Sequence, residues 1–277
     1  MAVLTTHPKP LQWLALALNR RLTRLNQYLD AKLVYPRLTR RLRDADLVFL
    51  NYGYQEDPPM AVPLSDADEP NRLPIQLYHR VATQSDLAGK EVLEVGCGHG
   101  GGASYLTRTL KPATYTGLDL NSEGIDYCRQ RHSVAGLSFV EGDAERLPFP
   151  DQAFDVVINL ESSHVYPHFS QFLAEVSRVL RPGGNFLYAD FRPDKAVADW
   201  EAALANAPLV MTSQQDISEQ VTRGLEEALP LWDDVIERFI PRALRAQAHR
   251  FNVMRRNYAF MRDGKFRYRM YSFVKEP

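Results

Sequence analysis

The stretch Glu91–Ala103, EVLEVGCGHGGGA, decides the fold class of this chain. Val92, Leu93 and Val95 form a short apolar run that predicts a buried strand, and glycines follow at once before helix-compatible residues resume. Glycine has no Cβ and tolerates positive φ, so a ligand can lie against the backbone while the first N–H groups of the helix face it. This order of strand, glycine turn and helix predicts a loop for a nucleotide-type cofactor. A tight turn without a ligand is the alternative.

The glycine spacing alone leaves two types of cofactor open, because three of the glycines also fit the dinucleotide pattern G-x-G-x-x-G. Both types require an acid after the second strand. Residues 115–118 predict that strand, and Asp119 follows it, where a carboxylate can accept both ribose hydroxyls of an adenosine. Asp119 also suits a turn or a helix N-terminus, since Asn121 and Ser122 come next.

The composition indicates the number of domains, the kind of partner and the cellular compartment of the protein. With 277 residues, of which 45% are hydrophobic, the chain can form one large α/β domain with an appendage or two small domains. The formal net charge of −1 argues against a nucleic-acid partner. The two cysteines, Cys97 and Cys128, have neither metal-ligand spacing nor a disulfide framework, which predicts a cytoplasmic location and no metal site.

The N-terminal segment predicts an amphipathic helix over residues 10–34, because six leucines from Leu11 to Leu29 recur at intervals of three and four. The polar side of this helix is strongly basic. It can lie on an anionic membrane surface as a peripheral contact, or it can pack over the main domain with its arginines in solvent. The apolar run is too short to span a bilayer.

From Glu91 onward, strand and helix patterns alternate regularly, which predicts a doubly wound parallel α/β sheet. The expected strands cover residues 91–95, 114–118, 137–141, 154–160, 185–190 and 266–274. The expected helices cover residues 75–87, 102–110, 122–132 and 169–180, and helices dominate residues 196–260.

Five segments together resemble the class I S-adenosylmethionine-dependent methyltransferases. They are EVGCGHG at 94–100, GLDL at 117–120, GDAERLPFP at 142–150, FDVV at 154–157 and RVLRPGG at 178–184. The resemblance covers residues 45–277 and implies a Rossmann-like seven-stranded sheet with S-adenosylmethionine as the cofactor. It divides the chain into a basic helical extension (1–50), a cofactor-binding core (51–195) and a helical acceptor and lid region with a closing strand (196–277).

The resemblance also implies which residues bind the cofactor. In the family, the acid of the GDA segment contacts the adenine amino group, and it corresponds to Asp143, with Ala144 beside it. The expected cofactor-binding residues are Tyr52, Glu94, Gly96, Gly98, Gly100, Asp119, Leu120, Asp143, Ala144 and Leu160.

Within this class, two segments look like the mycobacterial phthiotriol and phenolphthiotriol dimycocerosate methyltransferases and related fatty-acid O-methyltransferases. They are NYGYQEDPP at 51–59 and ESSHVYPH at 161–168. The second is more distantly similar to the ESLHHMPD motif of natural-product sugar O-methyltransferases. This chain has Val165 and His168 where that motif has its second histidine and its aspartate, so the roles of those two residues do not carry over.

The expected chemistry is the methylation of a hydroxyl on a lipid, polyketide or other natural product. An aliphatic hydroxyl is a poor nucleophile, so a base that takes its proton accelerates the transfer. His164 is the candidate base, because it follows the fourth strand at the carboxyl edge of the sheet, where ligands of open α/β folds bind. Asp190 is the expected partner of its imidazole, and Glu161 competes for that role. A loop histidine without a catalytic role is the alternative.

Other functions also fit parts of the sequence. N- or C-methylation of a small metabolite is an alternative to O-methylation. A nicotinamide dehydrogenase is less favoured, since no Tyr and Lys proton-donor spacing is evident. A non-catalytic cofactor-binding scaffold is disfavoured because Glu94, Gly96 and Asp119 are all present. The expected partner is a small-molecule or lipid acceptor, and the sequence does not indicate an oligomeric state.

Overall fold

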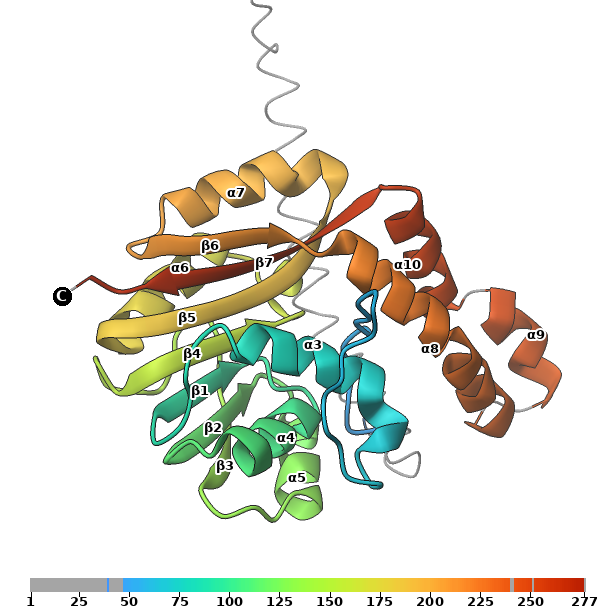
Figure 1. The fold of residues 1–277 in the computed structure, drawn as a ribbon, viewed down its shortest axis with the longest axis horizontal. Helices are drawn as coiled ribbons and strands as arrows, with labels where there is room; N and C mark the ends of the chain where they lie inside the picture. The colour runs from blue at the N-terminus through green and yellow to red at the C-terminus, as the bar shows by residue number, and fades with distance from the viewer. Residues whose placement is uncertain (1–38, 40–46, 240–241, 251, 277) are drawn as a thin grey trace, which may run out of the picture.

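A computed structural model describes residue 39 and residues 47–239, 242–250 and 252–276 of the chain (Figure 1). The amphipathic helix predicted over residues 10–34 lies outside the described residues.

One seven-stranded sheet forms the centre of the molecule, in the order β3-β2-β1-β4-β5-β7-β6 (Figure 1). Strands β1 to β5 are parallel, and β7 runs antiparallel to both of its neighbours. The strands are β1 (Glu91–Val95), β2 (Thr114–Asp119), β3 (Leu137–Glu141), β4 (Phe154–Leu160), β5 (Leu180–Pro193), β6 (Val210–Asp216) and β7 (Phe266–Val274). The predicted Rossmann-like sheet of seven strands is therefore confirmed, although β7 is antiparallel in a sheet expected to be parallel.

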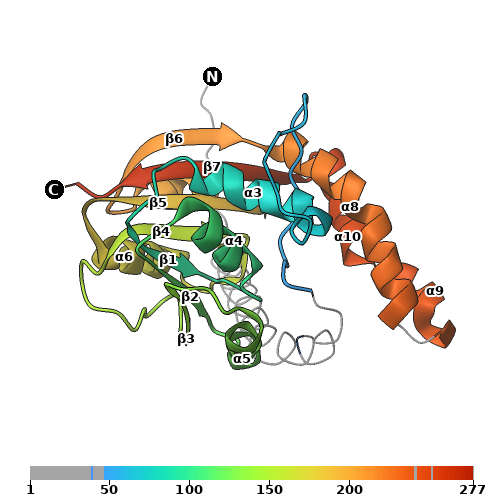
Figure 2. The same ribbon diagram turned by 60° about the horizontal axis from the view of Figure 1, so that its bottom comes forward.

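Helices cover both faces of this sheet (Figure 2). They are α3 (Arg72–Ala82), α4 (Gly101–Leu110), α5 (Ser122–Arg131), α6 (Phe169–Val179), α7 (Val197–Ala205), α8 (Ser218–Phe239), α9 (Arg242–Arg250) and α10 (Val253–Arg262). Helices α3, α4 and α5 pack on one face, and α6 and α7 pack on the other. Helices α8–α10, which we call the arm, extend beyond the sheet from the end of β6 (Figure 1).

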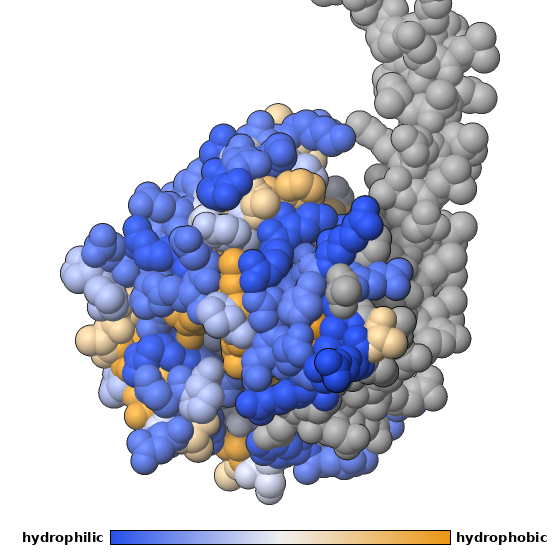
Figure 3. Space-filling model, turned by 90° about the vertical axis from the view of Figure 1, so that its right-hand side faces the viewer, coloured by the Kyte–Doolittle hydropathy of each residue, from blue (hydrophilic) through white to orange (hydrophobic). Residues whose placement is uncertain are grey.

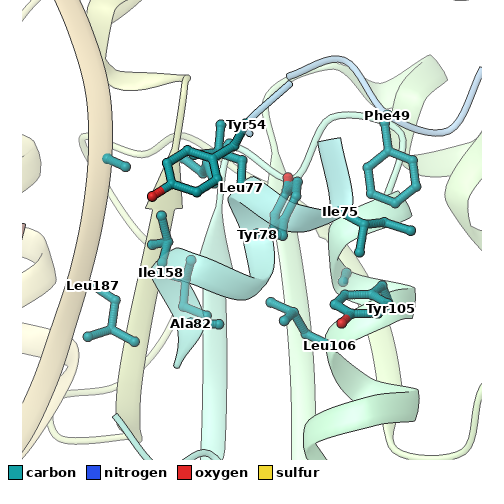
Figure 4. Close-up of a cluster of buried hydrophobic side chains, with 14 of the residues drawn as sticks. Phe49, Tyr54, Ile75, Leu77, Tyr78, Ala82, Tyr105, Leu106, Ile158 and Leu187 are labelled. Carbon is teal, nitrogen blue, oxygen red and sulfur yellow. The ribbon is translucent and has the colours of Figure 1, made fainter. Parts of the chain in front are cut away.

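The apolar core forms two layers because neighbouring strand residues point to opposite faces. Val92 packs in the layer beneath α3 and α4, whereas Leu93 packs in the layer against α6. Figure 4 shows side chains of the first layer, in which Ile75 and Leu77 of α3 and Leu106 of α4 belong to one buried cluster.

The structure corrects the sequence-based assignment in three places. Helix α3 begins at Arg72 and ends at Ala82, whereas a helix over residues 75–87 is expected from the sequence. Strand β6 lies inside the region expected to be dominated by helices, and strand β5 is longer than residues 185–190. Strand β6 is an edge strand whose side chains are mostly exposed or half-buried, so its residues VMTSQQD lack a clear apolar alternation. Within the described residues it pairs with β7, and the paired residues are 53 to 64 positions apart in sequence, from Asp216 with Arg269 to Val210 with Val274.

Candidate functional site

A short segment of residues 48–55, which we call the strap, crosses the glycine loop at the carboxyl edge of the sheet. The Gly101 N–H donates to the Val48 carbonyl at 3.0 Å. The Leu50 side chain lies over Gly98, where an added Cβ would stand 3.1 Å from Leu50 Cδ1. The strap therefore contacts the loop that is expected to hold the cofactor.

The other end of the strap is joined to the arm. A Cβ added to Gly224 of α8 would lie 2.3 Å from the carbonyl carbon of Gly53, so only glycine allows this crossing of two backbones. The Gln55 N–H donates to the Gln220 carbonyl at 3.1 Å, and Asn257 of α10 donates to the Tyr52 hydroxyl at 2.6 Å. The cofactor loop and the arm thus share one connecting segment.

The glycine loop has the conformation that its sequence predicts. Gly96, Gly98 and Gly100 have φ values of 81°, 55° and 75°, in the left-handed region that glycine tolerates and other residues rarely adopt. At Gly96, a Cβ would also stand 2.2 Å from Ser162 Oγ. At Gly100, a Cβ would stand 2.8 Å from the Phe139 ring, so glycine at these positions also lets neighbouring side chains pack closely against the loop.

Asp119 supports this loop from the end of β2. Its carboxylate accepts the Gly98 N–H and the Asn121 N–H, both at 2.9 Å. The contact with Asn121 is the turn role that the sequence left open, and the contact with Gly98 places the carboxylate against the cofactor loop. Binding of the ribose hydroxyls by Asp119 stays a prediction.

Two buried amide oxygens at this edge fit an incoming cofactor. The side-chain oxygens of Asn121 and Asn159 are buried, and no donor among the described residues reaches them. The Asn159 amide itself donates to the Val95 carbonyl at 2.8 Å, which places it beside the glycine loop. A buried acceptor without a donor is costly, so a ligand with N–H groups, such as S-adenosylmethionine, suits this edge.

The remaining cofactor candidates lie in different surroundings. Leu160 is buried at the end of β4, Leu120 is half-buried after β2, and Ala144 is buried in the turn that follows β3. The Asp143 carboxylate accepts the Glu145 N–H at 2.9 Å. Direct contact of these four residues with the cofactor stays a prediction.

Glu94 is fully buried beneath the glycine loop. Its two carboxylate oxygens accept the hydroxyls of Tyr78 and Tyr115 at 2.8 and 2.9 Å. Burial raises the pKa of Glu94 to about 7, although the two hydroxyls oppose this shift. Because both oxygens are occupied, the geometry favours an anchoring role for Glu94 over direct contact with the cofactor.

His164 and Asp190 are brought together across 26 residues of sequence. His164 lies in the short helix η4 (Ser163–Val165) after β4, and its Nδ1 stands 2.9 Å from Asp190 Oδ1 at the end of β5. Asp190 is fully buried, which by itself would raise its pKa, but the Arg192 guanidinium and His164 hold that pKa well below its usual range. Asp190 is therefore an ionised partner that orients the imidazole.

Glu161, the competing partner, is engaged elsewhere. Its carboxyl group accepts the Tyr52 N–H at 2.9 Å and the Tyr268 hydroxyl at 2.8 Å. Burial raises the pKa of Glu161 to about 8, with the negative charge of Asp190 adding to the shift. Glu161 also has a φ of 49°, an uncommon backbone conformation for a non-glycine residue that often marks a functional site.

A surface hollow of about 480 Å³ lies beside the His164–Asp190 pair. Its polar lining includes His164, His168, Arg192 and Asp199, and its apolar lining includes Pro167, Phe169, Trp200 and Ala203. On the other side, the His164 ring packs against Phe191 with centroids 4.5 Å apart. An acceptor with both a polar and an apolar part fits such a lining.

Sequence reasoning missed several residues of this site. Arg192 contacts Asp190, Tyr268 contacts Glu161, and Asn257 contacts the strap. Arg192 follows Asp190 by two residues, which is a usable signal, whereas Tyr268 and Asn257 reach the site only through the fold. No group of three potential metal ligands occurs among the residues that the structure describes.

The fold and this site together define a methyltransferase of the S-adenosylmethionine-dependent class. Residues 93–188 match the family described as a methyltransferase domain. The chain is 60% identical to the fatty-acid O-methyltransferase of Mycolicibacterium smegmatis over 88% of this chain and 89% of that protein. It is 55% identical to the phthiotriol/phenolphthiotriol dimycocerosates methyltransferase of Mycobacterium tuberculosis over 87% of this chain and 90% of that protein. The chain belongs to the methyltransferase family of these two relatives.

Solved structures share the fold. The geranyl diphosphate methyltransferase in complex with SAM has a TM-score of 0.59 at 18% identity, covering 83% of this chain and 99% of that one. The geranyl diphosphate C-methyltransferase from Streptomyces coelicolor A3(2) has a TM-score of 0.61 at 18% identity, covering 87% and 97%. The relatives confirm the predicted family and its methyltransferase activity, for which S-adenosylmethionine is the cofactor. The solved structures confirm the fold.

The raised pKa of Glu161 predicts a pH-dependent stability effect. The folded chain keeps this proton up to about pH 8, whereas the unfolded chain loses it near pH 4.5, so the contribution is present below pH 4.5 and is lost as the pH rises through 8. Glu161→Gln does not titrate. Relative to wild type, its Tm should therefore rise by several degrees between pH 5 and pH 8.5, since about 1 kcal/mol moves Tm by roughly 2–4 °C.

Calorimetry of both proteins at the two pH values measures this difference. Glu94→Gln should show the same trend with a midpoint nearer pH 7. A Tm difference between Glu161→Gln and wild type that does not change with pH would show that Glu161 is ionised throughout.

Proposed function

We propose that this protein is an S-adenosylmethionine-dependent O-methyltransferase that acts on a hydroxyl group of a lipid. The contact that carries the proposal is the 2.9 Å approach of His164 Nδ1 to the buried carboxylate of Asp190. The names of the two relatives, one for a fatty acid and one for a dimycocerosate lipid, support a lipid acceptor. The apolar lining of the adjacent hollow supports it as well.

The His164–Asp190 pair favours a hydroxyl over a carboxylate as the accepting group. A fatty-acid carboxylate is already ionised at neutral pH and needs no base, whereas an alcohol must lose a proton as the new bond forms. An N–H on His164 Nδ1 donates to Asp190, which leaves Nε2 to take that proton. The imidazolium that results is stabilised by the ionised carboxylate behind it.

Methyl transfer requires the accepting oxygen, the methyl carbon and the sulfur to be collinear, so positioning is a large part of the catalysis. S-adenosylmethionine supplies the sulfonium methyl group when it is bound. The residues of the chain contribute the proton transfer and the positioning of the reacting groups. His164 removes the proton and Asp190 fixes the imidazole. Phe191, on which Tyr52 of the strap stacks, covers one side of the imidazole.

Replacing His164 with alanine tests this assignment. His164→Ala should lower kcat for a long-chain secondary alcohol at least tenfold, because it removes a general base. Removal of such a base typically costs about 10²- to 10⁴-fold in rate. The affinity for S-adenosylmethionine should stay unchanged. His168→Ala is the matched control, because His168 lines the same hollow but bonds to Glu145 at 2.7 Å. Full activity of His164→Ala would remove His164 from the mechanism.

We further propose that the protein contacts an anionic membrane peripherally. No helix in the described part of the chain is long and apolar enough to cross a bilayer. The face in Figure 3 is mainly hydrophilic with small apolar areas. Two arginines of the arm are paired with carboxylates of the arm. Arg238 bonds to Asp234 and Arg245 bonds to Glu237, both at 2.8 Å. The basic N-terminal residues are therefore the stronger candidates.

Co-sedimentation with vesicles tests the membrane proposal. Binding to anionic but not neutral vesicles is expected, with loss at about half-molar salt because exposed charges are then strongly screened. Replacing Arg20, Arg21 and Arg24 with glutamine should weaken the binding, since each basic residue near the surface contributes about 1 kcal/mol. The control replaces the paired residues Arg238 and Arg245. Equal binding to both vesicle types would contradict the proposal.

A further inference from the structure

Arg192 is a nearly buried cation that the mechanism above does not use. Its side chain is 12% exposed and lies at the end of β5, two residues after Asp190. The guanidinium carbon lies 4.7 Å from the centroid of the Trp200 ring and 5.5 Å from that of Phe169. Burying a charge is costly unless it is paired, so the partners of this guanidinium indicate its role.

Those partners all belong to the surroundings of the His164–Asp190 pair. Arg192 donates to Asp190 Oδ2 at 3.0 Å, to Ser163 Oγ at 3.0 Å and to the Phe191 carbonyl at 2.7 Å. Ser163 in turn donates to the same Asp190 oxygen at 2.6 Å. The guanidinium is fixed by hydrogen bonds and by two aromatic rings, which suits a permanent structural charge.

The two carboxylate oxygens of Asp190 serve different partners. Oδ1 accepts from His164 Nδ1 at 2.9 Å and from the Phe191 N–H at 2.8 Å. Oδ2 accepts from Ser163 and Arg192. One buried carboxylate is therefore shared between a permanent cation and a histidine that gains a positive charge when it takes a proton.

The charges around this carboxylate can be counted. When His164 is neutral, the charges of Asp190 and Arg192 cancel. When His164 is protonated, one net positive charge remains in a poorly hydrated site. Several other titratable groups surround the pair. They are Glu161 after β4, Asp199 on α7, His168 before α6, Tyr188 on β5 and Tyr268 on β7. Among the residues that the structure describes, Arg192 is the permanent cation bonded to the same carboxylate.

We propose that Arg192 is a positioning residue that holds the Asp190 carboxylate in place and whose fixed positive charge, on the same carboxylate, opposes a second positive charge on His164. The inference rests on the proposed role of His164 as the base. The guanidinium holds the carboxylate at a fixed distance from the imidazole, and its charge opposes a second positive charge nearby. A carboxylate without this cation would favour the imidazolium, which cannot accept the proton of the hydroxyl.

The pH dependence of kcat for a long-chain secondary alcohol tests this role in Arg192→Met, Arg192→Gln and Arg192→Lys. The two neutral variants should move the acidic limb of the profile to higher pH by about one unit. Their activity at the pH of the original midpoint should therefore fall about fivefold beyond any loss of the plateau. Arg192→Lys keeps the charge, so its limb should stay in place even if the loss of the planar guanidinium lowers the plateau. Unchanged affinity for S-adenosylhomocysteine verifies that each variant is folded.

Two results would overturn the inference. A lower plateau with an unmoved acidic limb in both neutral variants would mean that Arg192 only supports the fold. A higher KM for the acceptor with unchanged kcat and an unmoved limb would mean that Arg192 binds the acceptor directly. Failure of the proposed function would give a different result. His164→Ala would then show the same acidic limb as the wild type.

Discussion

The buried charge of Asp190 is the constraint on which the active edge of the sheet depends. A carboxylate removed from water costs several kcal/mol unless hydrogen-bond donors surround it. Here the donors come from η4 and from the end of β5, and they include His164, Ser163 and Arg192. The hydrogen bonds to the Asp190 carboxylate therefore fix the conformation of the chain after β4 and direct the imidazole toward the hollow.

Glu161 and Asp190 show how two neighbouring carboxyl groups acquire different properties. Asp190 faces a guanidinium and an imidazole and is ionised, whereas Glu161 faces uncharged donors from Tyr52 and Tyr268 and has a pKa of about 8. Divergent pKa values in a pair of carboxyl groups are typical of sites that move protons. The difference assigns the partnership with His164 to Asp190 on physical grounds.

The strap extends this organisation to the cofactor loop and the arm. It contacts Gly98 and Gly101 at one end and crosses α8 at Gly224 at the other. Tyr52, in the middle of the strap, donates its N–H to Glu161 and stacks on Phe191, with centroids 5.2 Å apart. A shift of the arm would therefore be transmitted to the loop through backbone contacts.

Much of this arrangement could be predicted from the sequence because its signals are local. The glycine loop follows an apolar run, and the carboxyl ends of neighbouring parallel strands meet at one edge, so His164 and Asp190 could be paired without coordinates. Strand β6 could not be placed, because its pairing with β7 spans about 60 residues and its side chains are largely exposed. The contacts of Tyr268 and Asn257 with the site also depend on distant chain segments.

The central claim is that the His164–Asp190 pair deprotonates a lipid hydroxyl for methylation. The most direct measurement offers the protein labelled S-adenosylmethionine with equal amounts of a long-chain secondary alcohol and a fatty acid of the same length, and identifies the labelled product by mass spectrometry. The methyl ether should be the main product, and His164→Ala should form it at least tenfold more slowly. A methyl ester as the main product, formed equally well by His164→Ala, would contradict this claim.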